Sequence, residues 1–274
     1  MTGGIVYEFL KLQRIKEVSM SFLLSVCLAL FTVLAPASPV AADTGNSLFQ
    51  LSTLPALMAG VYDGAMTIEE LSKHGDFGLG TFDALDGEMI VFNGRFYQAK
   101  DGGSVETVMS EQTSPFAQLT LFDPEMSLTV EGVTDINTLV AAIQAGLSSV
   151  NYPYAIKITG EFESVLCRSV PAQKRPYPPL GDVVAHQKTF SFENQAGVMV
   201  GFFGPSYTSN FGVPGFHFHY LTADREGGGH VLNVKAKTLL IEIDALDSIM
   251  TILPKNEAFA QLPAAETTAH ATDK

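Results

Sequence analysis

Three histidines gather in one short segment of this chain, and their spacing constrains the local fold more than any other feature. His217, His219 and His230 make up half of the six histidines. Side chains alternate along a β-strand, so His217 and His219 lie on the same face of one strand. The glycines at 227–229 allow a sharp return that carries His230 back to the first two. The pattern predicts two neighbouring strands that present three imidazoles to one point.

The same three side chains predict a metal site. Neutral imidazole is the commonest metal ligand, and three such ligands on zinc leave a fourth, tetrahedral position for water or substrate. Imidazole also binds copper, nickel, cobalt and iron, so the spacing alone does not select the metal. The alternative is a surface hairpin whose histidines are incidental.

Two charged residues outside this segment are candidates for chemistry. Glu88 follows the turn Asp86-Gly87 and enters an apolar strand, so it points either into a cleft or into solvent. Arg168 closes another strand, and its guanidinium fork suits a carboxylate. A surface position paired with Glu161 or Glu163 is the alternative for Arg168.

The first 42 residues have the order of a secretory signal peptide. Three basic residues precede an apolar stretch at 20–34, and small residues lead to Ala42. We expect cleavage after Ala42 and export to a periplasm or out of the cell. The apolar stretch is shorter than the roughly 20 residues that a membrane-spanning helix needs, which leaves an uncleaved anchor as the alternative. Translation starts at Met1 or at Met20.

The cysteine content excludes an intramolecular disulfide bond in the mature chain, and the net charge limits the classes of binding partner. Cleavage removes Cys27 and leaves Cys167 alone, so the mature chain forms no intramolecular disulfide. It also removes three basic and two acidic residues, which leaves 13 Lys and Arg against 27 Asp and Glu, a net charge of −14. Nucleic acid is therefore not an expected partner, because binding phosphates requires a cationic surface.

Hydrophobic periodicity and turn residues predict a mixed α+β fold. We expect helices at 47–62, from 67 to about 75, from a cap at Thr134, and at 246–253 before Pro254. The dipeptides Asp86-Gly87 and Asn93-Gly94 predict hairpins. The expected strands are 81–85, 88–92, 95–98, 119–122, 127–131, 154–159, 162–170, 198–203, 216–222, 230–235 and 238–243.

A proline-rich stretch at 171–179 suggests a division of the chain after the signal peptide at 1–42. We expect an N-terminal α/β sheet domain at 43–170, a C-terminal, β-rich, metal-binding domain at 171–262 and a flexible tail at 263–274. The fold class is therefore α/β of the mixed α+β kind. Two mainly antiparallel or mixed sheets with flanking helices would carry the metal site on strands of the C-terminal half.

From about residue 48 to residue 262 the chain resembles the α-acetolactate decarboxylase family. The resemblance rests on six short motifs that follow one another in the family's order. They are HGDFGLGTF at 74–82, DGE at 86–88, TSPFA at 113–117, RSVP at 168–171, the pair His217 and His219, and GGGH at 227–230.

The resemblance implies a zinc enzyme in which His217, His219 and His230 bind Zn²⁺. By the same comparison Glu88 is a catalytic acid/base, Arg168 faces the substrate, and Thr81 lines the site. The family uses a second glutamate near its C-terminus, for which Glu257 and Glu266 both remain candidates.

The implied reaction belongs to acetoin biosynthesis, in the butanediol pathway. The implied substrate is a small 2-hydroxy-3-oxo acid, 2-acetolactate, which loses CO₂ through a metal-stabilised enediolate to give (R)-acetoin. A homodimer is also implied, whereas an export signal is absent from many relatives. Two alternatives remain: an exported zinc hydrolase that uses the same three histidines, and a non-enzymatic metal-binding protein.

Overall fold

The computed structural model describes residues 46–263. The predicted signal peptide and Glu266 therefore lie outside the described residues. Within residues 46–263, no helix has the length and apolar character needed to cross a membrane.

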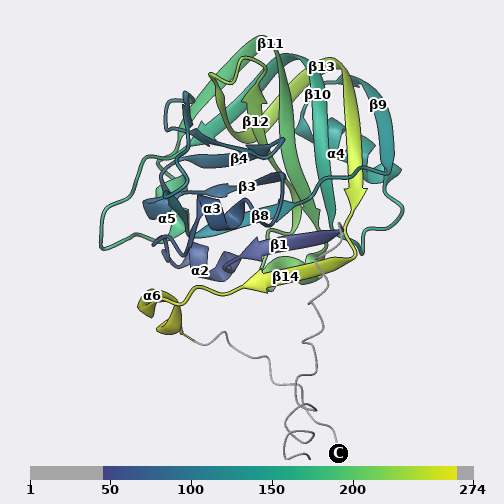
Figure 1. Ribbon diagram of the computed structural model, residues 1–274. Helices are drawn as coiled ribbons and strands as arrows, with labels where there is room; N and C mark the ends of the chain where they lie inside the picture. Colours follow the sequence, from purple (N-terminus) through teal and green to yellow (C-terminus); the bar gives the residue numbers. More distant parts are fainter. Residues whose placement is uncertain (1–45, 264–274) are drawn as a thin grey trace, which may run out of the picture. The chain divides into compact units, whose positions relative to one another are not determined.

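Seven strands form the larger sheet, in which only the pair β1–β14 is parallel (Figure 1). Its order is β14 (Ser248–Ile252), β1 (Ser47–Leu51), β8 (Phe116–Thr120), β3 (Phe77–Thr81), β4 (Glu88–Phe92), β5 (Arg95–Ala99) and β6 (Val105–Thr107).

Five longer strands form a second, antiparallel sheet. Its order is β10 (Tyr154–Ser169), β11 (Lys188–Gly204), β12 (Gly215–Thr222), β13 (Gly228–Ala245) and β9 (Met126–Val133). Because β10 also pairs with β13, the four strands β10 to β13 close into a ring of pairings. A short two-stranded ladder joins β2 (Met66–Thr67) and β7 (Thr113–Ser114).

Helices are few and short. They are α2 (Leu54–Met58), α3 (Ile68–Leu71), α4 (Ile136–Gly146), α5 (Leu180–Val184), α6 (Glu257–Ala260) and the 3₁₀ turns η1 (Asp83–Leu85) and η2 (Ser206–Asn210).

Apolar side chains from both sheets meet in a shared core. Leu79 and Ile90 of the larger sheet are completely buried in one cluster with Val200 and Leu221 of the smaller sheet. On its other face the larger sheet packs against α3, and the smaller sheet packs against α4. Burying apolar surface on both faces of each sheet is what holds these layers together.

The predicted fold class is confirmed, and so are several local predictions. The side chains of Thr67 and Glu70 form the reciprocal hydrogen bonds of a capping box at the start of α3. Asn93 and Gly94 have φ of 51° and 71° and turn β4 back into β5. These features were predictable because each depends on neighbouring residues.

Two predicted helices are wrong. Residues 47–51 form strand β1, and the chain breaks at Ser52, which has φ of 65°, before Thr53 caps the short helix α2. Residues 248–252, predicted as helix, form strand β14. The two segments pair with each other in parallel, a contact between segments far apart in the sequence that local periodicity does not reveal.

Smaller corrections concern element ends. The strand predicted at 81–85 ends at Thr81 as β3, and η1 follows. Asp135, rather than Thr134, caps α4. The pairs of strands predicted around residues 160 and 236 are the single long strands β10 and β13.

The division at residue 170 stays a sequence prediction. Each sheet takes strands from both sides of it, since β14 joins the larger sheet while β9 and β10 belong to the smaller one.

Candidate metal centre and substrate pocket

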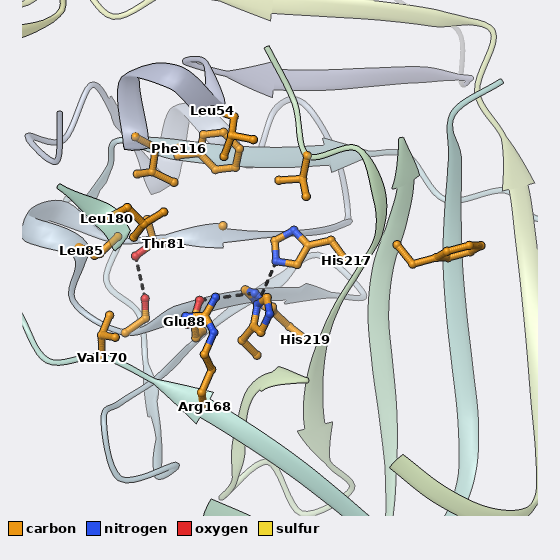
Figure 2. A pocket seen from close by; sticks show the side chains of 16 residues that line it. Leu54, Thr81, Leu85, Glu88, Phe116, Arg168, Val170, Leu180, His217 and His219 are labelled. Atoms are coloured by element: carbon orange, nitrogen blue, oxygen red, sulfur yellow. Dashed lines mark hydrogen bonds and ion pairs between the residues drawn. The ribbon is translucent and has the colours of Figure 1, made fainter. Parts of the chain in front are cut away.

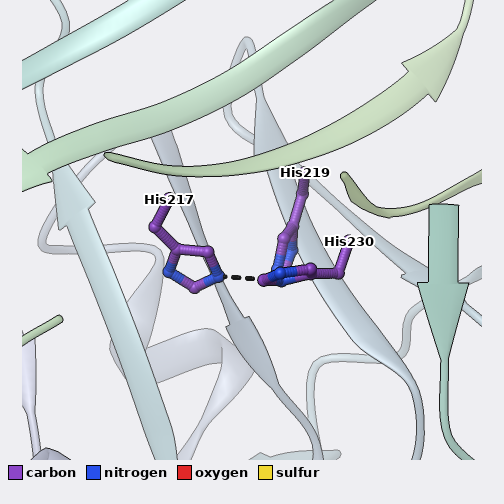
Figure 3. A group of neighbouring side chains, drawn as sticks. All are labelled: His217, His219 and His230. Atoms are coloured by element: carbon purple, nitrogen blue, oxygen red, sulfur yellow. Dashed lines mark hydrogen bonds between the residues drawn. The ribbon is translucent and has the colours of Figure 1, made fainter. Parts of the chain in front are cut away.

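The three histidines converge from two adjacent strands, as their spacing predicts. His217 and His219 lie on β12, and His230, near the start of β13, is the cross-strand partner of His219. One ring nitrogen from each histidine lies within 4.8 Å of the others. Figure 3 shows the three rings turned toward one another.

The hydrogen bonds of the three histidines leave some of their ring nitrogens free to bind a cation. His219 is 1% exposed, and its Nδ1–H donates to the backbone carbonyl of Met89 on β4 at 2.7 Å. This bond fixes the tautomer in which Nε2 carries a lone pair. His219 Nε2 and His217 Nδ1 are buried without a hydrogen-bond partner, and His217 Nε2 lies 3.1 Å from His230 Nδ1. Buried nitrogens in this state fit a cation that three histidines share.

Electrostatics keeps the imidazoles neutral, as metal ligands must be. Burial lowers the pKa of His217, His219 and His230, and the positive charge of Arg168 adds to this shift at all three. The negative charge of Glu88 acts in the opposite direction on the pKa of His219. The pKa of His219 is therefore lowered less than the pKa values of His217 and His230. All three side chains are therefore unprotonated at neutral pH, ready for a metal.

Glu88 and Arg168 form an ion pair beside the histidines. Glu88 begins β4, is 7% exposed, and accepts a hydrogen bond from Arg168 Nη1 at 3.2 Å. Its second carboxylate oxygen lies 3.4 Å from His219 Nε2. Arg168 lies near the end of β10, directly across from His230 on β13. Glu88 thus points into the site rather than into solvent, and it is the ion-pair partner of Arg168.

Thr81 and the turn after η1 hold Glu88 in place. Thr81 ends β3 opposite Glu88, and its hydroxyl donates to the carbonyl of Gly87 at 2.7 Å. Because its proton is engaged, the Thr81 oxygen can only accept a hydrogen bond from a ligand. Gly87 has φ of 78°, and a Cβ on it would lie 2.4 Å from the carbonyl oxygen of Ala99. The turn therefore requires glycine.

All six predicted site residues line one cavity of about 320 Å³ (Figure 2). Thr81, Glu88, Arg168 and the three histidines form its polar part. The rest of the lining is mainly apolar, with side chains from α2, η1, β8, α5, β12, Val170 just after β10, and Val213. A concave, mostly apolar pocket with a few converging polar groups is the usual form of a small-molecule site.

Sequence reasoning missed the apolar part of this cavity. Leu54, Leu85, Phe116 and Leu180 come from distant segments and have no shared pattern that would have linked them. Cys167 is completely buried, and burial raises the pKa of its thiol, so it packs as a small apolar residue. Glu257 lies in α6, accepts a hydrogen bond from Gln261 and is not among the residues that line the cavity.

Comparison with known proteins identifies the family of this chain. The family model for alpha-acetolactate decarboxylase matches residues 48–265. The chain belongs to the alpha-acetolactate decarboxylase family. It is 40% identical over 217 residues to the alpha-acetolactate decarboxylase of Methanosarcina mazei, an alignment that covers 79% of this chain and 75% of the relative. The Methylococcus capsulatus enzyme of the same name is 42% identical, over 78% of this chain and 82% of the relative.

A solved structure shares the fold. The crystal structure of alpha-acetolactate decarboxylase from Bacillus subtilis strain 168 superimposes with a TM-score of 0.77 at 35% identity, over 79% of this chain and 93% of that chain. The resemblance to the family is thereby confirmed, and the protein is a carboxy-lyase that acts on a small molecule. This result favours a decarboxylase over the hydrolase and the non-enzymatic metal-binding protein.

Proposed function

We propose that the protein decarboxylates 2-acetolactate to (R)-acetoin, with Zn²⁺ bound by His217, His219 and His230. One observation carries the proposal: three neutral histidines share a cavity with the ion pair of Glu88 and Arg168. The identity of the substrate is inferred from the relatives, which are named alpha-acetolactate decarboxylase.

The metal and the protein side chains have separate tasks. Bound Zn²⁺ supplies Lewis acidity, which stabilises the negative charge that develops on the ketone oxygen as CO₂ leaves. Zinc is preferred because an all-imidazole site with an open position is typical of catalytic zinc. The carbonyl of Met89 orients the His219 ring that would hold the ion.

The side chains bind the acid and move the proton. The Arg168 guanidinium pairs with the substrate carboxylate, which replaces Glu88 as its partner and holds C2 in the cavity. The bond between the carboxyl carbon and C2 breaks, and its electron pair moves toward the ketone oxygen. Glu88, which has then lost its ion pair with Arg168, takes up a proton from solvent and donates it to C2, which completes acetoin. Thr81 accepts a hydrogen bond from the substrate hydroxyl.

Metal depletion of the purified mature chain tests the proposal. Dialysis against a chelator should abolish the formation of acetoin and CO₂ from racemic 2-acetolactate, and stoichiometric Zn²⁺ should restore it. His217→Ala should lose bound zinc in elemental analysis, because the site keeps only two imidazoles. Full activity of the depleted protein, or unchanged zinc in His217→Ala, would contradict the assignment. Restoration by cobalt, nickel, copper or iron but not by zinc would show that another metal is used.

We further propose export after cleavage behind Ala42, and a homodimer in solution. The order of basic, apolar and small residues in the first 42 positions supports export, and the family resemblance supports the dimer. A mature N-terminus at Asp43 by mass spectrometry and a light-scattering mass twice that of one chain are the expected results. An intact N-terminus or a monomer mass would contradict the respective proposal.

A further inference from the structure

We infer that Gln98, a buried glutamine on β5, is a positioning residue that aims the Glu88 carboxyl group at one face of the substrate and thereby sets which enantiomer of acetoin forms. It acts through the backbone of Asp86, without touching the substrate. The inference rests on the proposed function, in which Glu88 donates the proton that reaches C2.

Gln98 lies on the face of the larger sheet opposite to Glu88. It is the cross-strand partner of Met89, and side chains of directly opposite residues share a face, here the one that packs against α3. Glu88, the residue before Met89 on β4, therefore points to the other face, where it contacts His219. Gln98 is 3% exposed and is not among the described residues that line the cavity. Any effect of Gln98 on the substrate must therefore pass through the backbone.

The hydrogen bonds of Gln98 hold the turn that precedes Glu88. Its Nε2 donates to the backbone carbonyl of Asp86 at 2.6 Å and to Asp86 Oδ2 at 3.1 Å, and its Oε1 accepts from Gln112 Nε2 at 3.3 Å. Lys100 Nζ lies 2.6 Å from the same Asp86 Oδ2. A buried amide costs free energy unless it is hydrogen-bonded. An apolar side chain in place of Gln98 would leave the Asp86 carbonyl without this donor.

The peptide group between Asp86 and Gly87 is held at both of its polar atoms. Its carbonyl accepts from the glutamine on β5, and its N–H donates to the carbonyl of Val170 at 3.1 Å. Val170 lies two residues after Arg168, the ion-pair partner of the proton donor. One peptide plane thus connects β5 with the end of β10, and it fixes the proton donor relative to the arginine that pairs with the substrate carboxylate.

The face from which the proton arrives decides which enantiomer forms. Once CO₂ has left, C2 is trigonal and flat, so protonation from one face gives (R)-acetoin and protonation from the other gives (S)-acetoin. A donor held to one side of C2 gives a single enantiomer. A carboxyl group that moves freely, or water that enters beside it, protonates both faces. The enantiomer ratio of the product therefore reports the position of Glu88, which a measurement of stability does not.

Gln98→Met tests the inference, because methionine is unbranched and adapts to the space of the glutamine but has no donor. We would supply racemic 2-acetolactate to the zinc-loaded mature protein and analyse the acetoin by chiral chromatography early in the reaction. The ratio of (R)- to (S)-acetoin and kcat should each fall about tenfold or more, since a misplacement of roughly 1 Å can cost about 10²-fold in rate. KM and zinc content should stay close to those of the wild type, because Arg168 and the histidines are unchanged.

Gln118→Met is the matched control. Gln118 lies on β8 of the same sheet, is also 3% exposed, and its Nε2 donates to Gln50 Oε1 at 2.9 Å. Loss of this buried hydrogen bond should lower the free energy of unfolding in urea about as much as Gln98→Met does. The enantiomer ratio should nevertheless stay at the wild-type value, because Gln118 does not contact the turn before Glu88.

Asp86 offers a second pair of variants, at a half-buried position. Asparagine keeps a side-chain oxygen that can accept from Gln98 and Lys100, whereas alanine keeps only the backbone carbonyl. Asp86→Asn should therefore keep the wild-type enantiomer ratio, and Asp86→Ala should lower it, though by less than Gln98→Met does. This pair keeps the test decisive if Gln98→Met does not fold, since an unchanged ratio in Asp86→Ala would overturn the inference.

The Glu88→Gln background separates a positioning role from a structural one. If Gln98 acts through Glu88, adding Gln98→Met to Glu88→Gln should change kcat by less than about twofold, because the effects of residues that act as a unit are not additive. A structural role predicts the same factor in both backgrounds.

The outcomes distinguish this inference from the proposed function. If the wild-type protein forms no acetoin, the proposed function fails and this inference fails with it. If the wild-type protein forms acetoin, the inference alone is overturned by an unchanged enantiomer ratio in Gln98→Met or by an equal fall of the ratio in Gln118→Met. An equal factor for Gln98→Met in the wild-type and Glu88→Gln backgrounds would overturn it as well.

Discussion

His219 takes its orientation from a backbone atom of the other sheet, and this illustrates how residues of the site depend on one another. The carbonyl of Met89 accepts its Nδ1–H, and Glu88, the next residue back along β4, contacts its other nitrogen. The histidine cluster was predictable because strand periodicity alone brings His217 and His219 to one face. The roles of Glu88 and Arg168 came only from family resemblance. Their ion pair joins strands of different sheets, and solvent is the usual environment of both residue types.

Glu88→Gln tests the proton transfer at the scale of one residue. The amide keeps the shape of the carboxylate but supplies no acidic proton, so we expect zinc content to stay the same while kcat falls about 10²–10⁴-fold. KM should change far less than kcat. Steady-state kinetics with racemic 2-acetolactate and elemental analysis of the same sample provide the measurement.

Glu163→Gln is the control for this change. Glu163 is an exposed glutamate on β10, the strand of Arg168, and should tolerate the substitution without loss of activity. Wild-type turnover by Glu88→Gln, or equal losses in the two variants, would remove Glu88 from the mechanism.

Secondary-structure elements were predicted correctly where a local turn determines them. They were predicted poorly where a strand forms by pairing with a segment far away in the sequence. The turn at Asn93-Gly94 follows from two residues that tolerate positive φ. By contrast, every residue of β1 is buried, so β1 lacks the alternation by which strands are recognised. Its parallel partner β14 lies near the other end of the described chain. Sequence periodicity carries no information on such a pairing.

The two glycine turns beside β4 provide a matched pair of variants. Gly87 and Gly94 both have positive φ, at 78° and 71°, so alanine strains each backbone by about 1 kcal/mol. A Cβ at Gly87 would also lie 2.4 Å from a backbone oxygen, whereas the nearest atom to one at Gly94 is 4.0 Å away. Gly87→Ala must therefore displace the turn that leads into Glu88, and a shift of roughly 1 Å can cost about 10²-fold in rate.

We expect Gly94→Ala to keep its activity and Gly87→Ala to lose most of it. Urea unfolding should show a larger loss of stability for Gly87→Ala as well. Equal activity of the two variants, at equal zinc content, would show that the position of Glu88 does not depend on this turn.

On the scale of the whole molecule, the segment between β8 and β9 connects the two sheets, and buried Asp244 of β13 holds it. The backbone N–H of Asp123 donates to Asp244 Oδ2 at 3.1 Å, and Glu125 accepts from the N–H of Ala245 at 3.2 Å. Asp244 is 0% exposed, and its second carboxylate oxygen has no hydrogen-bond partner. Burial, together with the negative charges of Glu125 and Asp123, raises the pKa of Asp244 to about 7.

This raised pKa makes the stability of the protein depend on pH in a defined direction. Between about pH 4 and pH 7 the folded chain holds a proton on Asp244 that the unfolded chain has released, so stability falls as pH rises through this window. Asp244→Asn removes the buried charge, and its amide can donate to Glu125. One pKa unit corresponds to about 1.4 kcal/mol, and because Asp123 and Glu125 are exposed, solvent screens part of the full effect. We expect Asp244→Asn to gain about 2 kcal/mol in the free energy of unfolding at pH 8, and nothing at pH 4.

Asp247→Asn is the control, because Asp247 is an exposed aspartate on the same chain segment. Urea titrations of this variant at pH 4 and pH 8 should show no such pH-dependent gain. A gain of equal size at pH 4 and pH 8 would mean that packing, rather than the charge of Asp244, limits stability at the junction of the two sheets.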